Sequence, residues 1–252
     1  MYVTCKGLVL RVTPYNDTDA LVTILTTEQG RVCAKVRGLR RKNSPMSAPC
    51  QLLCYSEFTL FAYKDHFTVN EASTIETFAA LRKDLQKLSL ATYFAQAAEV
   101  MSQEDMPTPE LLSLLLNCLY ALSSLNLPEN QVKAVFEMRA ACLSGYAPDL
   151  SLCHICGEAV PDCIDINEGV TVCHRCIPPG APGLRIPISP GILWAMRYIC
   201  QCDPKKIFAF QLPDEGLEKL SQVTEAYLST QLERGFSALD FYKSLFYRSD
   251  DL

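Results

Sequence analysis

The stretch that decides how the chain is organised is FEMRAACLSGYAPDLSLCHIC (Phe136–Cys156), followed after sixteen residues by CHRC (Cys173–Cys176). A Cys-x-x-Cys turn can present two thiolates to one ion, and two such turns supply the four sulfurs of a tetrahedral Zn²⁺ site. The spacing C-x2-C-x16-C-x2-C is typical of a zinc ribbon. The sequence therefore predicts a structural zinc site in which protein fills all four positions: Cys153, Cys156, Cys173 and Cys176.

Two disulfides or four buried thiols are the alternative interpretations of these cysteines, and the paired spacing favours the metal. His154 and His174 lie inside the two turns, where we expect them to face solvent or support the ligands rather than bind the ion. A helix that ends at Gly145 is predicted to lead into the segment, because glycine readily takes the left-handed conformation that closes a helix.

Composition indicates a globular protein without a membrane segment. The 252-residue chain is 49% hydrophobic and 20% charged, and it has no apolar run of eighteen residues. Its N-terminus, MYVTCKGLVLRV, is typical of a strand rather than a signal peptide. We therefore expect a cytoplasmic location, where thiols stay reduced, so the thirteen cysteines do not indicate a disulfide framework.

Positive charge is concentrated in the N-terminal third, although the whole chain has a net charge of −5. Residues 1–80 carry nine Lys/Arg against seven Asp/Glu. A cluster of cations can follow a phosphate backbone whatever the total charge of the protein. The predicted DNA-binding residues are the four cations of residues 37–42 and two on the preceding strand: Arg37, Arg40, Arg41, Lys42, Lys35 and Arg31. The alternative is an ordinary solvated loop.

Aromatic side chains near this cluster could stack on bases, although strand alternation must place about half of them inside the fold. These aromatic residues are Tyr2, Tyr15, Tyr55, Phe58, Phe61, Tyr63 and Phe67.

Residues 3–75 have the pattern of five short strands with one long loop in the middle. The predicted strands are Val3–Val12, Ala20–Thr26, Arg31–Arg37, Leu52–Tyr63 and Phe67–Ile75. Gly30 is expected to supply the positive φ of the turn between the second and third strands. Five strands in this length favour a small closed barrel, either an OB-fold or an SH3-like barrel, because strand count does not separate the two.

Helical periodicity begins near Thr77, so the fold class is predicted to be α+β. We expect four parts: a small β-barrel that binds nucleic acid (1–78), a first helical part (79–150), a zinc-ribbon-like insertion (151–182) and a second helical part (183–252). Helices are predicted to begin at Ser189-Pro190, at Asp214 and at Ser237.

The sequence offers little for catalysis, and we expect a binding protein rather than an enzyme. Of the three histidines, His66 lies in a turn and the other two lie in the cysteine turns. The chain contains no Walker motif, GxSxG elbow or GxGxxG motif. Cys200-Gln201-Cys202 lacks the two-residue spacing of a redox motif, so its cysteines are interpreted as small apolar residues.

Across nearly its whole length the chain resembles the RecO family of bacterial DNA repair proteins. No single motif decides this, but the order and spacing of several are specific. The matching stretches are Gly7–Leu10, Tyr15–Asp19, Leu25–Gly30, Arg37–Arg41 with Ser44, Phe136–Arg139, Gly145–Leu150 and Cys153–Gly157, with Tyr227, Leu228 and Leu239 near the end.

The resemblance implies an N-terminal OB-fold, a helical domain and an inserted zinc-ribbon-like segment. It also implies binding of single- and double-stranded DNA, annealing of complementary strands, and work with RecR to load RecA onto strands coated by single-stranded DNA-binding protein. A nucleoid-associated location would follow. The acidic, apolar tail of that coating protein needs a cation beside an apolar groove, and Lys133 and Arg139 are the candidates. A protein–protein scaffold with a structural zinc and no DNA affinity of its own is the alternative.

Overall fold

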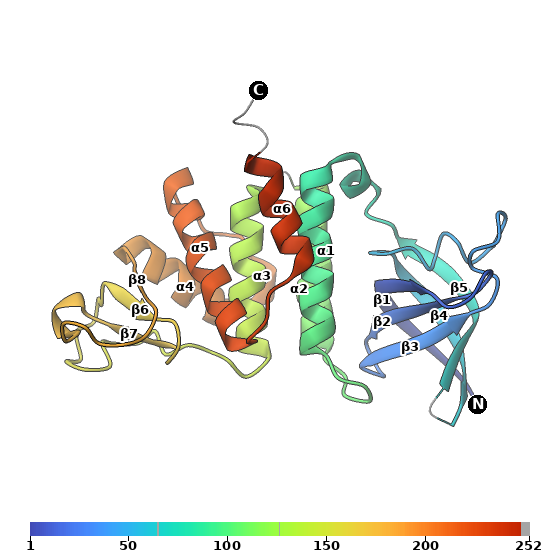
Figure 1. The fold of residues 1–252 in the computed structure, drawn as a ribbon, viewed down its shortest axis with the longest axis horizontal. Helices are drawn as coiled ribbons and strands as arrows, with labels where there is room; N and C mark the ends of the chain where they lie inside the picture. The colour runs from blue at the N-terminus through green and yellow to red at the C-terminus, as the bar shows by residue number, and fades with distance from the viewer. Residues whose placement is uncertain (65, 126, 248–252) are drawn as a thin grey trace. The chain divides into compact units, whose positions relative to one another are not determined.

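The computed structural model describes residues 1–64, 66–125 and 127–247, so the predicted part that ends at residue 252 extends beyond the described residues. The chain divides into two compact units, and Figure 1 labels their helices and strands. The first is formed by residues 1–126 with residues 236–252, and the second by residues 127–235.

The N-terminal part of the first unit is a closed five-stranded barrel. Its strands are β1 (Tyr2–Pro14), β2 (Ala20–Thr26), β3 (Arg31–Val36), β4 (Tyr55–Tyr63) and β5 (His66–Glu76). They follow the order β1-β2-β3-β5-β4, and β1 pairs with β4 to close the barrel. Only the β3–β5 pair is parallel among these neighbours. This Greek-key closure is that of an OB-fold, so the predicted fold class is confirmed and the SH3-like alternative is not needed.

Alternation along the strands builds the core of the barrel. The inward-facing side chains are fully or almost fully buried and come from all five strands; they include Val9, Val22, Ile24, Val32, Ala34, Phe58, Leu60 and Val69. Gly30 has φ +66° as predicted. A Cβ at Gly30 would stand 2.5 Å from the Met106 carbonyl oxygen, so only glycine lets residues 103–106 approach this turn.

Helices complete the first unit. A 3₁₀ turn (Ala79–Lys83) leads into α1 (Leu85–Met101), which is followed by α2 (Pro109–Ser124), and α6 (Ser237–Tyr247) packs on α1. The Asp84 carboxylate caps α1 by accepting from the backbone N–H groups of Gln86 and Lys87.

The second unit combines three helices with a small sheet. The helices are α3 (Glu129–Leu143), α4 (Pro190–Gln201) and α5 (Asp214–Gln231). The sheet has the order β7-β6-β8, with β6 at Cys163–Asp165, β7 at Val170–Val172 and β8 at Arg185–Pro187. The strand β8, which pairs with β6, begins after residue 182, the predicted end of the insertion. The sheet of the insertion therefore extends beyond the predicted boundary.

The predicted helix boundaries agree with the structure. Gly145, just beyond α3, has φ +88°, and the Ser189 hydroxyl caps α4 by accepting from the Ile192 N–H. Predicted starts at Asp214 and Ser237 are the first residues of α5 and α6. In the described part of the chain, no helix has the length and apolar character needed to cross a membrane.

Candidate nucleic-acid interface and metal centre

The basic loop, defined as Arg37–Lys42, leaves the end of β3 and is fastened to the turn between β1 and β2. The Asp19 carboxylate accepts a hydrogen bond of 2.9 Å from the Gly38 N–H and lies 3.0 Å from the Lys35 ammonium. These contacts, the Gly38 amide first and the Lys35 ammonium second, hold the pKa of Asp19 well below its usual range. Asp19 therefore remains an anion that fixes the start of the loop.

A second set of contacts fixes the middle of the loop. The Arg40 N–H donates to the Thr18 carbonyl at 2.9 Å, and its guanidinium donates to the Asn16 carbonyl at 2.6 Å. Gly38 has φ +66°, and the Arg41 N–H donates back to the Gly38 carbonyl to form a tight turn. The stretches Tyr15–Asp19 and Arg37–Arg41, which are separate in the sequence, thus form one structural element.

The four cations of the basic loop all have exposed side chains: Arg37, Arg40, Arg41 and Lys42. Within the described residues, none of the four forms a salt bridge. The two predicted strand cations differ. Arg31 donates to the Glu99 carbonyl at 2.8 Å and lies 3.6 Å from Glu104, and Lys35 is paired with Asp19. Their charges already have partners inside the first unit.

Exposed aromatic rings also lie on the barrel. Tyr2, Tyr15 and Tyr63 are each about 60% exposed, and Phe61 lies 5.2 Å from the ring of Tyr2. Tyr15 borders the basic loop, because the Lys35 ammonium lies 4.8 Å above its ring. Phe58 fills the core instead, as strand alternation requires. The remaining two predicted stacking residues, Tyr55 and Phe67, are half-buried.

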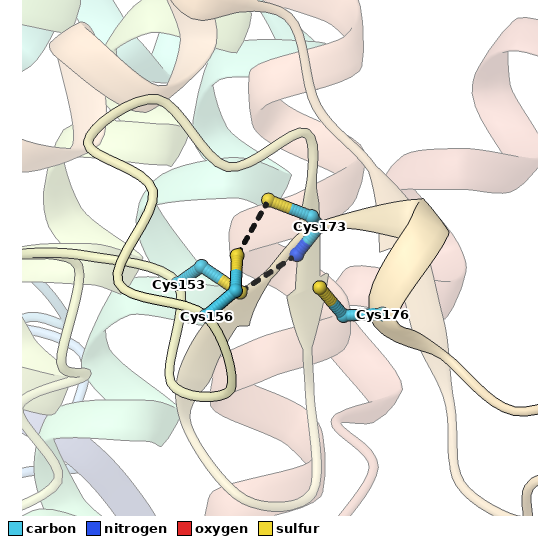
Figure 2. A group of neighbouring side chains, drawn as sticks. All are labelled: Cys153, Cys156, Cys173 and Cys176. Atoms are coloured by element: carbon cyan, nitrogen blue, oxygen red, sulfur yellow. Dashed lines mark hydrogen bonds between the residues drawn. The ribbon is translucent and has the colours of Figure 1, made fainter.

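The second candidate site is the cysteine cluster, defined as Cys153, Cys156, Cys173 and Cys176, and Figure 2 shows their side chains gathered together. The four sulfurs all lie within 4.8 Å of one another. Sulfurs at the corners of a tetrahedron with bonds of about 2.3 Å lie about 3.8 Å apart. The Cys156 and Cys173 sulfurs are 3.8 Å apart. The spacing and chemistry of these donors fit one metal ion.

Each half of the cluster is held by backbone hydrogen bonds. The Gly157 N–H donates to the Cys153 carbonyl, and Gly157 has φ +75°, which closes the first turn. The Cys176 N–H donates to the Cys173 carbonyl in the same way, and the Cys173 N–H donates to the Cys153 sulfur at 3.2 Å. A turn of this type directs successive cysteines to one point, as a metal knuckle requires.

The backbone around Cys153 favours its thiolate form. Burial opposes ionisation, but N–H groups of Cys156, Cys173 and Ile155 outweigh burial and lower the pKa of Cys153 to about 6. A thiolate is the form that binds a metal ion. The two histidine side chains lie outside the group of four sulfurs, and both His154 and His174 are exposed.

Lys133, predicted to contact a partner, lies inside the second unit, and only 2% of its side chain is exposed. Its ammonium is 3.0 Å from a Glu137 oxygen, 2.9 Å from a Glu225 oxygen and 3.1 Å from the Ser221 carbonyl. A partner could reach this charge only after the network opened. The Lys133 ammonium is therefore not exposed for the partner contact that the sequence predicted.

Arg139, the other residue predicted to contact a partner, is half-buried. Its guanidinium donates to the carbonyls of Ile199 at 3.1 Å and Cys200 at 2.6 Å. Both carbonyls lie at the C-terminal end of α4. This contact ties α3 to the end of α4, so much of the hydrogen-bonding capacity of Arg139 is used within the unit.

Comparisons with known proteins match almost the whole chain to one family. The family described as Recombination protein O N terminal matches residues 1–78, and Recombination protein O C terminal matches residues 82–240. The DNA repair protein RecO of Acetivibrio thermocellus is 34% identical over 246 residues, which cover 97% of each chain. The proteins of the same name from Alkaliphilus metalliredigens and Bacillus subtilis are 28% and 27% identical, and cover 97% and 90% of this chain.

Proposed function

The chain belongs to the RecO family of DNA repair proteins, and from this premise we propose that it binds single- and double-stranded DNA and anneals complementary strands. With RecR it would help to load RecA onto strands coated by single-stranded DNA-binding protein. Its working location would be the cytoplasm, at the nucleoid.

The basic loop is the observation that carries this proposal. Four exposed cations stand together on an OB-fold, in a loop held by hydrogen bonds to the Asn16 and Thr18 carbonyls and the Asp19 carboxylate. Annealing needs no catalytic residue, because its main barrier is the repulsion between two phosphate backbones. A loop that neutralises phosphates while the bases stay free to pair would lower this barrier.

A zinc ion in the cysteine cluster would have a structural role in this function. Cys153, Cys156, Cys173 and Cys176 would bind it and leave no open position for substrate or water. When bound, zinc would supply a cross-link between the two turns. The chain's own residues contribute the backbone donors that favour a thiolate and the β6–β7 hairpin that joins the two turns.

RecR, RecA and the single-stranded DNA-binding protein are proposed as partners on the basis of family membership. The acidic tail of the coating protein is proposed to bind the helical part, with Lys133 and Arg139 as the cations named for it. Because Lys133 is buried, that contact would require the network around it to open.

An annealing assay tests the proposal. Arg37, Arg40, Arg41 and Lys42 are changed together to Glu, and the rate at which labelled complementary oligonucleotides pair is measured. We expect annealing to be lost while the thermal melt is nearly unchanged, because the four side chains are exposed and the Arg40–Asn16 hydrogen bond that is lost lies at the surface. The matched control reverses four other exposed cations, Lys83, Lys205, Lys206 and Arg234, and should keep the activity.

Full annealing by the loop variant would refute the role of the basic loop. Loss of activity in both variants would mean that net charge, rather than this loop, matters. A protein that neither binds nor anneals DNA, but still binds RecR, would instead be a protein–protein scaffold. The net charge of −5 is compatible with that role.

A further inference from the structure

Two thiols meet where α3 and α4 end. Cys142 is the last residue but one of α3, and Cys200 is the last residue but one of α4. Their sulfurs lie 3.5 Å apart, although 57 residues separate them in the sequence. Apart from the cysteine cluster, this is the one place in the described residues where two sulfurs are in hydrogen-bonding contact.

The surroundings of this pair distinguish it from the other thiols. Both cysteines are partly exposed, so a small oxidant can reach them. The Arg139 guanidinium is held beside them by its bond of 2.6 Å to the Cys200 carbonyl. The hydrogen bond with Cys200 lowers the pKa of Cys142, and Arg139 lowers it further against the effect of burial, while the same bond raises the pKa of Cys200.

Other cysteines lack one or both of these properties. Burial raises the pKa of Cys5 to about 11 and of Cys50 to about 12, and Cys118 is buried with its pKa raised for the same reason. Cys33 is exposed but has no second sulfur in hydrogen-bonding contact within the described chain. Reactivity toward an oxidant requires a thiolate and access to solvent, and a disulfide additionally requires a second sulfur.

We propose that Cys142 and Cys200 form a dithiol that peroxides oxidise to an intramolecular disulfide. The Cys142 thiolate attacks one oxygen of the peroxide, the O–O bond breaks, and the leaving hydroxide takes up a proton to become water. The Cys200 sulfur then attacks the sulfur of the resulting sulfenic acid. The S–O bond breaks and a second water leaves with the Cys200 proton, so two thiols are oxidised and one peroxide is reduced.

Formation of this bond requires the two sulfurs to move closer together. The sulfurs must approach from 3.5 Å to about 2.05 Å, the length of a disulfide bond. Both residues lie in the last turn of a helix, where the backbone adjusts most easily. The closed bond would join the two ends of the segment that contains the whole cysteine cluster, residues 143–199.

Peptide mapping tests the proposal on the whole chain as purified. The protein is treated with hydrogen peroxide, its remaining thiols are alkylated, and it is digested with trypsin and chymotrypsin without reductant. Cleavage after Tyr146 separates Cys142 from the cluster cysteines. We expect a peptide containing Cys142 to be linked to the peptide containing Cys200, with the loss of two hydrogens, and the link to disappear on reduction.

Variants assign the bond. Cys142→Ser and Cys200→Ser should each abolish the linked peptide, while Cys202→Ser and Cys33→Ser should keep it. Linkage of Cys142 to Cys202 or to a cluster cysteine would overturn the proposal. So would wild-type protein in which Cys142 and Cys200 stay fully alkylatable after peroxide has oxidised Cys33, a result that needs no variant to fold.

Discussion

At the scale of single residues, Asp19 anchors the candidate DNA-binding surface, although its negative charge does not favour contact with DNA. Its carboxylate accepts from the Gly38 N–H and pairs with Lys35, so it fixes the point where the basic loop leaves β3. Sequence patterns identified the cations of the loop but not this anchor. The signal was present, because Tyr15–Asp19 and Arg37–Arg41 both matched the family, but no rule of spacing links two stretches so far apart.

Asp19→Asn should loosen the basic loop without unfolding the barrel. Hydrogen exchange measured by mass spectrometry should be faster in residues 37–42, and affinity for single-stranded DNA should fall, because the cations would no longer be held together. Asp17→Asn removes the same charge two residues away and serves as the control, since Asp17 is exposed. Equal exchange rates in the loop of both variants would contradict the anchoring role.

The low pKa of Asp19 also predicts a pH dependence with a definite sign. A carboxyl whose pKa is lower in the folded state stabilises the fold fully above its unfolded pKa of about 3.9. This contribution is lost as the pH falls from there toward the folded value. The difference in urea stability between wild type and Asp19→Asn should therefore be complete at pH 7 and smaller at pH 3. A difference that grows on acidification would be inconsistent with this sign.

At the scale of elements, we expect the fold of the cysteine segment, residues 151–187, to depend more on the cysteine cluster than on the small hydrophobic cluster around it. Its buried hydrophobic group contains Cys153, Cys163, Val172 and Cys173, so two of its four members are proposed ligands. Each strand of its sheet has three residues. The hydrophobic cluster around the four cysteines is small, so we expect a cross-link to hold this part of the segment folded.

Removal of the metal should therefore unfold this segment. Structural zinc typically contributes about 10–16 kcal/mol to such sites, so chelation should expose residues 151–187 to hydrogen exchange while the barrel stays protected. Elemental analysis should find one zinc per chain, and none in the double variant Cys153→Ser/Cys173→Ser. Cys163→Ser, a buried cysteine of the same segment outside the cluster, should keep the metal. An unchanged fold in metal-free protein would exclude the structural role.

The contact between α3 and α5 contains a buried charged network that the sequence did not indicate. Lys133 lies between Glu137 and Glu225, and burial raises the pKa of Glu137 while Lys133 opposes this rise. A lysine in a helix is ordinarily assigned to the surface. Its true position depends on α5, which is remote in sequence, and helical periodicity carries no information about that partner.

Lys133→Met should lower the free energy of unfolding by about 3–5 kcal/mol, because it leaves the Glu137 carboxyl buried without its cation. Urea denaturation followed by circular dichroism measures this loss. Replacing both partners, as Lys133→Met/Glu137→Leu, should restore part of it, since no buried charge then remains on α3. A loss in the single variant below about 1 kcal/mol, typical of exposed pairs, would show that the network does not act as a buried one.

At the scale of the whole molecule, sequence patterns with a short period predicted the local elements. Contacts between residues distant in the sequence were not predicted. Alternation located all five strands of the barrel, and cysteine spacing located the cluster, because both signals are local. The parallel β3–β5 pair, which distinguishes an OB-fold from other barrels, joins residues about thirty positions apart. No residue pattern within either strand indicates this pairing. The contact between Cys142 and Cys200 was missed for the same reason.

The most direct test of the DNA-binding claim is the fluorescence anisotropy of a labelled single-stranded oligonucleotide, titrated with protein over a range of salt concentrations. Four neutralised phosphates predict a slope of about −3 for the logarithm of the binding constant against the logarithm of salt concentration. The variant with Glu at 37, 40, 41 and 42 should lose this salt-dependent binding. Binding by the variant with the affinity and slope of wild type would contradict the assignment of the basic loop.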